Sequence, residues 1–433
     1  MAEILNLNIN DNYNEWNIKR TAKQKTIVLK NTSQEYDVYK IPVDILVYNP
    51  TNGRMFMEAK RFENEEHTNL SSLKEKDPKK YNDEVENLIW STNEERNLST
   101  KRDIEKFGQI EPGVVLDDGT VIDGNRRFTC LRRLHREFPN DERFAYFLAA
   151  IIKVDGKQIT KKLLKEYELR VQFGTDEKVG YNVINKNMSI YWLIEKDNEN
   201  NFDYTSIAEL LGNGTTPGEV SRICKTCQLV DEFLEYIGKP GEYQIAEDMK
   251  VYWPLEPLSV YFMNDGKNLT DLEKIERKHL FFDYLLTLDV ALITQNLRDG
   301  LIRKVFKDNE ETKKLINEHK ETIGDRIHTI IDDSKDVDSF NESIKELKNS
   351  DEAIDDKENY EKSLSKQVAK NQIDIPLKEC KNALKSLENI NVNPLINASN
   401  SIADIKLSKV KKMLNEIENK ARTLIFEIEN SNG

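Results

Sequence analysis

Residues 114–133, VVLDDGTVIDGNRRFTCLRR, constrain the fold of this chain more than any other stretch. Two short apolar runs are joined by Asp-Asp-Gly-Thr, and an Asp-Gly pair accepts the positive φ angles of a tight hairpin turn. The second run leads into a turn at residues 123–125, after which apolar residues recur at helical spacing from about Arg126 to Phe138. The stretch therefore predicts a β-hairpin, a tight turn and an amphipathic helix.

The segments on either side of this stretch predict an α/β domain. Residues 26–48 alternate between apolar and polar side chains, with breaks at Pro42 and Asn49-Pro50, and FLAAIIKV at 147–154 is typical of a strand. Between them, residues 57–99 are charged and irregular in pattern, which predicts an inserted or loop-like segment. A helix is expected from near Ser99, ended by Gly108 and Pro112.

Helical patterns replace strand patterns from about residue 181 to the end of the chain. A length of 433 residues favours two or three domains. We expect three parts: an α/β (α+β) domain at 1–180, a small all-helical domain at 181–245, and a C-terminal helical region at 246–433.

Charge and cysteine content narrow the classes of function. The formal net charge of −13 repels nucleic acid at long range, so any binding of phosphate must be local. No apolar run approaches the length of a membrane span, and the N-terminus does not resemble a secretory signal, so we expect a cytoplasmic protein without a membrane partner. The four cysteines do not form a disulfide framework and are expected to remain thiols.

The turn before the central helix has the features of a phosphate site. The first turn of a helix leaves backbone N–H groups unpaired, and Gly124 lets a ligand approach the backbone closely. Arg126 and Arg127 oppose the helix dipole there, which is unfavourable unless an anion offsets them. Arginine also suits paired contacts to phosphate oxygens. Arg132, Arg133 and Arg136, later in the helix, are equally well explained as a solvated face paired with acidic neighbours.

Residues 41–138 resemble the ParB/sulfiredoxin superfamily, specifically the ParB-like N-terminal domain of chromosome and plasmid partition proteins. The resemblance rests on three boxes in family order: Asn49-Pro50 followed by Arg54, the GxxxP segment from Gly108 to Pro112, and Gly124-Asn125-Arg126-Arg127, which is similar to the family's Gly-Glu-Arg-Arg motif. The resemblance implies a nucleotide site in which Arg54 and the Gly124–Arg127 turn surround the phosphates.

The nucleotide is CTP in ParB proteins, and relatives use ATP or ADP. Asn125 replaces the family's glutamate. A further family box, Glu-Asn followed by arginine, is represented only by VQFGTDEKVGYN, with Gln172 and Asp176 as its equivalents. These departures leave open the base, hydrolysis and the use of Mg²⁺. Sulfiredoxin itself has its nucleophilic cysteine where this chain has Asn125, so a redox enzyme is not expected.

The segment from Asp203 to Leu234 has the spacing of a helix-turn-helix. Thr216, Pro217 and Glu219 predict a capped start to the second helix. Its apolar stripe leaves four side chains facing outward that are suited to phosphates and base edges: Ser221, Arg222, Lys225 and Gln228. ParB-like proteins carry a helix-turn-helix at this place in the chain. The alternative is a helical hairpin whose polar face is only hydrated.

No metal or catalytic set emerges from the sequence. Cys224 and Cys227 form a single CxxC pair without further ligands at zinc spacing, so both are expected in the core. The five histidines are scattered, and none is expected to sit next to an obvious acid or nucleophile. Catalytic residues therefore stay unassigned.

The C-terminal end predicts a helical hairpin at 370–430 and a homodimer. Apolar residues repeat at alternating three and four residues along two segments: Leu377, Cys380, Leu384 and Leu387, and then Leu407, Val410, Leu414, Ile417, Ala421, Leu424 and Ile428. NVNPLINASN between the segments can reverse the chain. Two helices rarely close a core, so the stripes are expected to pack on the middle of the chain or on a second subunit, and the resemblance favours the second subunit.

Three classes of function follow. The first is a ParB-like DNA-binding protein controlled by a bound nucleotide, in a partition, mobile-element or phage-defence setting. The second is an enzyme, such as a nucleoside triphosphatase, that uses the same pocket for hydrolysis or phosphoryl transfer. The third, a nuclease, has the weakest support because no compact metal-binding set stands out.

Overall fold

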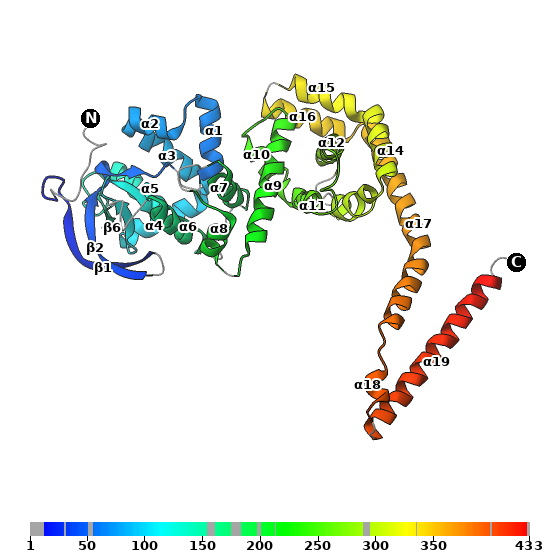
Figure 1. Ribbon diagram of the computed structural model, residues 1–433. Helices are drawn as coiled ribbons and strands as arrows, with labels where there is room; N and C mark the ends of the chain where they lie inside the picture. The colour runs from blue at the N-terminus through cyan, green and yellow to red at the C-terminus, as the bar shows by residue number, and fades with distance from the viewer. Residues whose placement is uncertain are drawn as a thin grey trace. The chain divides into compact units, whose positions relative to one another are not determined.

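The computed structural model describes residues 13–29, 32–50, 55–153, 161–174, 183–196, 201–212, 214–288, 295–334, 336–398 and 401–430. The chain divides into two compact units, Met1–Leu364 and Ser365–Gly433. The first unit begins with a mixed six-stranded sheet and its helices and continues as a helical region (Figure 1). The boundaries expected near residues 180 and 245 both fall inside this unit.

The sheet has the order β1-β2-β6-β4-β5-β3. Its strands are β1 (Lys19–Leu29), β2 (Thr32–Pro42), β3 (Val47–Tyr48), β4 (Gly113–Leu116), β5 (Thr120–Asp123) and β6 (Tyr146–Ile152). The predicted hairpin is confirmed as the antiparallel pair β4 and β5, with Gly119 at φ 82° in its turn. β3 runs parallel to β5, so the carboxyl ends of these two strands lie at the same edge of the sheet.

Four helices occupy the region between β3 and β4: α1 (Phe56–Glu66), α2 (Leu70–Lys76), α3 (Pro78–Thr92) and α4 (Glu94–Phe107). The expectation of an irregular segment at 57–99 is therefore wrong. Phe62, Tyr81 and Val85 are buried in the core that covers the sheet, although charged residues separate them in sequence. Asp77 and Asn93, which resemble loop residues in sequence, instead cap the starts of α3 and α4.

The predicted central helix is confirmed as α5 (Asn125–Glu137), which packs on α3 and α4. After β6 come α6 (Lys161–Gly174), α7 (Val183–Glu195), α8 (Tyr204–Leu211) and α9 (Pro217–Tyr236). Helices α8 and α9 occupy the two segments predicted to form the helix-turn-helix. The capping box between Thr216 and Glu219 is present at the start of α9.

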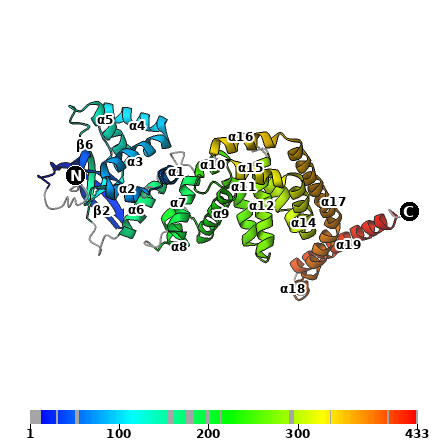
Figure 2. The ribbon, with the colours of Figure 1, turned by 90° about the horizontal axis from the view of Figure 1, so that it is seen from above.

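The rest of the first unit is helical (Figure 2). Its elements are α10 (Tyr243–Asp248), α11 (Tyr252–Met263), α12 (Asp271–Thr287), a π-helical segment (Asn296–Ile302), a short 3₁₀ turn (Val305–Lys307), α14 (Asn309–His319), a second π-helical segment (Lys320–Gly324), α15 (Asp325–Asp333) and α16 (Val337–Lys348). Buried side chains of α7 to α9 belong to the same apolar core as those of α11, α12 and α14. The segment predicted to form a helix-turn-helix is thus part of the larger helical body.

The long helix α17 (Asp351–Glu388) spans the division between the two units, and α18 (Asn393–Ile396) and α19 (Ser401–Asn430) follow it. The two predicted C-terminal helices are confirmed. Their apolar stripes are exposed within this unit, with Leu384 at 59% and Leu424 at 42% exposure. No helix among the described residues is long and apolar enough to cross a membrane.

Candidate functional site

The turn between β5 and α5 has the geometry expected of an anion site. Gly124 is the N-cap residue of α5 and has a left-handed backbone, with φ 97°. A Cβ atom at this position would lie 2.9 Å from the ring of Phe147, so a larger residue is disfavoured for two reasons. As a glycine, the N-cap residue has no side chain that could cap the first N–H groups of α5. Those groups can therefore bind an anion.

Asn125, the first residue of α5, carries an unusual buried group. Its side chain is 8% exposed, and its Oδ1 has no hydrogen-bond partner among the described residues. A buried acceptor without a donor costs about 1–3 kcal/mol, so such groups are uncommon in folded proteins. The position marks a place where a donor from a ligand would be stabilising.

The two arginines of the first turn point in different directions. Arg126 donates from Nε to Oδ1 of Asn97 in α4, at 3.0 Å. Arg127 donates to the backbone oxygens of Glu111 and Pro112, and its Nη2 lies 3.4 Å from Oδ1 of Asp123. The structure thus brings the predicted Gly108–Pro112 box and the Gly124–Arg127 turn together, with Arg127 joining them.

Asn49, at the carboxyl end of β3, lies at the same edge of the sheet as this turn. Its Nδ2 donates to Oε2 of Glu168 in α6 at 3.0 Å, and Nζ of Lys165 lies 3.0 Å from the same oxygen. Glu168 is 3% exposed. Asp123 and burial both raise the pKa of the Tyr167 hydroxyl, with burial as the larger cause, which places α6 beside the turn.

Sequence reasoning missed Glu168 and Lys165. The sequence signal that could have indicated a buried Glu168 is its position between two apolar residues, Tyr167 and Leu169, and the structure buries both of them. A second missed carboxylate is Glu58 in the first turn of α1. Burial raises its pKa, and its Oε2 has no hydrogen-bond partner in the described chain.

The remaining arginines of α5 have a structural role. Arg132, Arg133 and Arg136 all donate to the carboxylate of Glu86 in α3, with Arg132 at 2.9 Å and Arg133 at 3.0 Å. The Glu86 side chain is only 2% exposed. Acidic pairing, the alternative that the sequence left open for these three residues, is confirmed, although the carboxylate is buried rather than solvated.

Three other expected nucleotide contacts receive no side-chain description. Arg54 and Asp176 lie outside the described residues. Gln172 lies in α6, but its side chain is also outside what the structure describes. Their assignment to the nucleotide site stays a prediction.

The expected recognition helix α9 has one solvent-exposed face, and α11 packs against another face. Lys225 and Gln228 are exposed and are joined by a hydrogen bond of 3.2 Å. Ser221 and Arg222 are half-buried, and Nε of Arg222 lies 3.1 Å from Oε1 of Glu256 in α11. Arg222 is thus held by an acid that the sequence pattern did not reveal.

Cys224 and Cys227 are both buried in the core, as expected. Burial raises the pKa of the Cys224 thiol to about 12, and likewise that of Cys130, which makes both thiols poor nucleophiles. Among the described residues, no group of three or more histidine, cysteine or acidic side chains could hold a metal ion.

The expectation that no histidine lies beside an acid is wrong, because the fold brings distant acids next to His319. His319 is buried between two carboxylates, with Nδ1 2.9 Å from Oδ1 of Asp356 and Nε2 2.9 Å from Oδ2 of Asp283. Burial alone would lower its pKa, but the two carboxylates raise it to about 9. Tyr236, the last residue of α9, donates to the other oxygen of Asp283 at 2.7 Å. This cluster therefore connects α9, α12, α14 and α17.

No protein-family model, curated protein or solved structure matches the chain.

Proposed function

We propose that this chain is a ParB-like DNA-binding protein controlled by a nucleotide, CTP or ATP with or without Mg²⁺, that binds at the β5–α5 turn. The observation that carries the proposal is the buried, unpaired Oδ1 of Asn125 at the start of a helix whose N-cap is a left-handed glycine. The three sequence boxes that resemble the ParB-like domain support the same site. Two of them meet through Arg127.

The residues present fit a nucleotide. The first N–H groups of α5 suit phosphate oxygens, and Arg126 adds a positive charge in the same turn. An amino or hydroxyl group of the nucleotide would satisfy Oδ1 of Asn125.

The proposed DNA contacts lie on α9. Lys225 and Gln228 are exposed, and Arg222 becomes available when a phosphate competes with Glu256. Helix α6 connects the two proposed sites, because it packs both on β5, which leads into the nucleotide site, and on α8, the first helix of the predicted helix-turn-helix. A shift of α6 on nucleotide binding would therefore alter the helix-turn-helix.

Duplex binding with and without nucleotide tests the proposal. Replacing Arg222 and Lys225 by glutamate places two negative charges on the proposed recognition face, and we expect duplex binding to be lost while nucleotide affinity stays at the wild-type value. Fluorescence anisotropy with labelled duplex measures the first quantity and calorimetry the second. A folded double variant that binds duplex as tightly as wild type would falsify the helix-turn-helix assignment.

The second candidate function is a nucleotide-hydrolysing or phosphoryl-transferring enzyme. The observation that favours it is Glu58 of α1, a buried carboxylate beside Asn185 of α7 whose raised pKa is of the kind that a general base needs. Release of inorganic phosphate, measured with and without DNA, separates the two candidates. Steady release without DNA favours the enzyme, whereas nucleotide binding without release favours the controlled DNA-binding protein.

We also propose that the chain forms a homodimer through its C-terminal helices. Exposed apolar stripes on α17 and α19 include Leu377 at 58% and Ile428 at 64%, and burial against a second copy would stabilise both. We expect light scattering to give twice the chain mass for the full protein and the single mass for a chain ending near residue 370. A monomeric full-length protein, or a truncated chain that remains dimeric, contradicts this proposal.

A further inference from the structure

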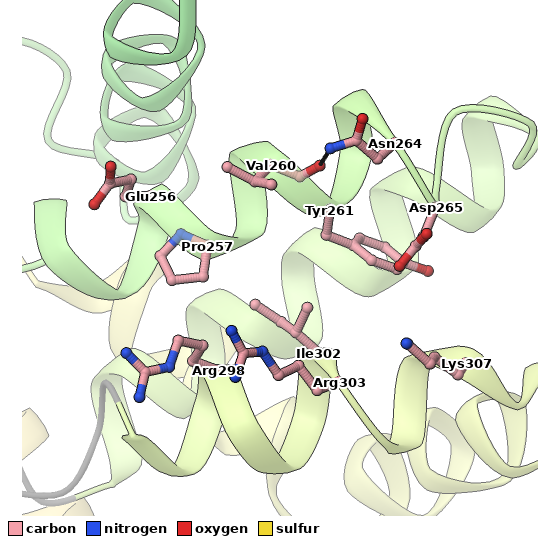
Figure 3. Close-up of a pocket in the computed structure, with 10 residues that line it drawn as sticks. All are labelled: Glu256, Pro257, Val260, Tyr261, Asn264, Asp265, Arg298, Ile302, Arg303 and Lys307. Atoms are coloured by element: carbon pink, nitrogen blue, oxygen red, sulfur yellow. Dashed lines mark hydrogen bonds between the residues drawn. The ribbon is translucent and has the colours of Figure 1, made fainter. Parts of the chain in front are cut away.

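An open groove of about 460 Å³ lies between α11 and residues 296–307. Figure 3 shows its two sides: Pro257 and Val260 come from α11, and the basic side chains of Arg298, Arg303 and Lys307 come from the opposite side. The opposite side is unusual in backbone structure, because Asn296–Ile302 forms π-helical turns, which occur frequently at functional sites.

Positive charge exceeds negative charge on the basic side. Arg298 and Arg303 share one carboxylate, that of Asp299, each at 2.9 Å. Their side chains remain 43% and 65% exposed. Lys307, one turn further along, is also exposed. On this side one carboxylate serves two guanidinium groups, which leaves them able to bind an additional anion. Glu256 and Asp265 place two carboxylates on the other side of the groove.

The groove adjoins the proposed recognition helix. Glu256 lines the groove and also forms the 3.1 Å ion pair with Arg222 of α9. Thr226 of α9 and Ser259 of α11 are joined by a buried hydrogen bond of 3.0 Å, so α11 is fixed against the flank of α9. A ligand lying along α9 at Arg222 can thus extend over Glu256 into the groove.

We propose that Arg298, Arg303 and Lys307 bind backbone phosphates of the DNA that α9 contacts. This inference rests on the proposed DNA-binding function. In a chain of net charge −13, duplex binding requires a local row of cations, and backbone contacts of this kind set the position of the duplex without reading its sequence. Partly exposed arginines are suited to such backbone contacts, because each guanidinium can donate two parallel hydrogen bonds to the oxygens of one phosphate.

The salt dependence of duplex binding tests the proposal. Each phosphate contact contributes about 0.9 to the slope of log K against log salt concentration, so Arg298→Ala with Arg303→Ala should reduce the slope by about 1.8 on any duplex sequence. Lys307→Ala alone should reduce it by about 0.9 and serves if the double variant fails to fold. The full-length protein is used throughout, and circular dichroism checks the fold.

Arg326→Ala with Lys320→Ala is the matched control, because both residues are exposed and ion-paired but do not line the groove. Its slope should equal that of wild type. An unchanged slope in the folded double variant and in Lys307→Ala, with wild type binding duplex normally, overturns the groove proposal alone. Wild type that binds no duplex at low salt instead overturns the DNA-binding function on which the groove depends.

Discussion

At the C-terminal end of α5, Arg132, Arg133 and Arg136 converge on the buried carboxylate of Glu86, whereas at its N-terminal end Arg126 donates to the amide oxygen of Asn97. The first set is held by a full negative charge in a dry environment, and its members fix α5 against α3. Arg126 donates to a neutral acceptor in the turn where the helix dipole is positive. An anion bound at the N-terminal end would add a second charge partner beside Asp123, whereas the arginines of the C-terminal end already share Glu86.

The difference teaches that the five arginines of this helix do not make one site. The sequence does not distinguish the two groups, because the position of a distant carboxylate, Glu86, decides which arginines are structural. We expect substitutions at the two ends to affect different measurements. Those at the Glu86 end should change stability, and those at the Gly124 end should change ligand affinity.

Removing the shared carboxylate should have the largest effect. Glu86→Ala removes the buried carboxylate that the three arginines share, although Arg132 keeps Asp83 and Arg133 keeps Asn87 as partners. Breaking a buried ion pair from one side costs about 3–5 kcal/mol of unfolding free energy. Urea denaturation measures this loss. Glu352→Ala, which removes an exposed partner of Arg326, is the control and should cost no more than about 1 kcal/mol. A similar, small loss in both variants would break the comparison.

His319, held between Asp283 and Asp356, is a second buried charge cluster that can be compared with Glu86 and its arginines. It differs because the histidine can lose its positive charge as the pH rises. Its pKa is about 9 in the folded protein, against an ordinary value of about 6.5 in the unfolded chain. The folded state therefore binds the proton more tightly, so this stabilisation is complete below about pH 6.5 and is lost as the pH rises through about 9.

We expect the free energy of unfolding to fall by about 3 kcal/mol between these limits, measured by denaturation at a series of pH values. In His319→Gln the fall over the same pH range should be much smaller. If the variant and wild type decline in parallel, the protonated histidine between Asp283 and Asp356 is not what stabilises this cluster.

At the other end of α5, Arg126→Ala should weaken nucleotide binding by about 1.5–3 kcal/mol, the usual loss of a charge-assisted hydrogen bond. That is about a ten-fold to hundred-fold rise in Kd, measured by calorimetry. Arg136→Ala is the matched control, since Arg136 lies in the same helix and its side chain is 54% exposed. Equal affinities in the two variants would remove the distinction between the ends.

Local sequence signals predicted much of the fold. The Asp-Gly hairpin, the start of α5 and the capped start of α9 each depend on residues a few positions apart, and all three are present. The same signals failed at 57–99, because charged residues separate the apolar residues that are buried there, such as Phe62 and Val85, and so hide the helical pattern. Caps such as Asp77 look like loop residues when their helix is not recognised.

The site was predicted only where its parts are adjacent in sequence. Glu86 lies 46 residues or more from its arginines, and Asn49 lies 119 residues from Glu168. A carboxylate so far away gives no periodic signal in a single sequence, so neither pairing could be expected. His319 was passed over for the same reason, because its two acids are 36 and 37 residues away.

A thermal-shift panel of CTP, ATP, GTP and ADP, with and without Mg²⁺, tests most directly whether the Gly124 turn binds a nucleotide. A ligand that binds only the folded state at 100 times its Kd adds about 2.7 kcal/mol to the unfolding free energy and raises Tm. The panel is run on wild type, Arg126→Ala and Arg136→Ala. We predict that CTP or ATP raises Tm of wild type and Arg136→Ala, with a clearly smaller rise in Arg126→Ala. No rise in wild type with any nucleotide, or equal rises in all three proteins, would contradict the account.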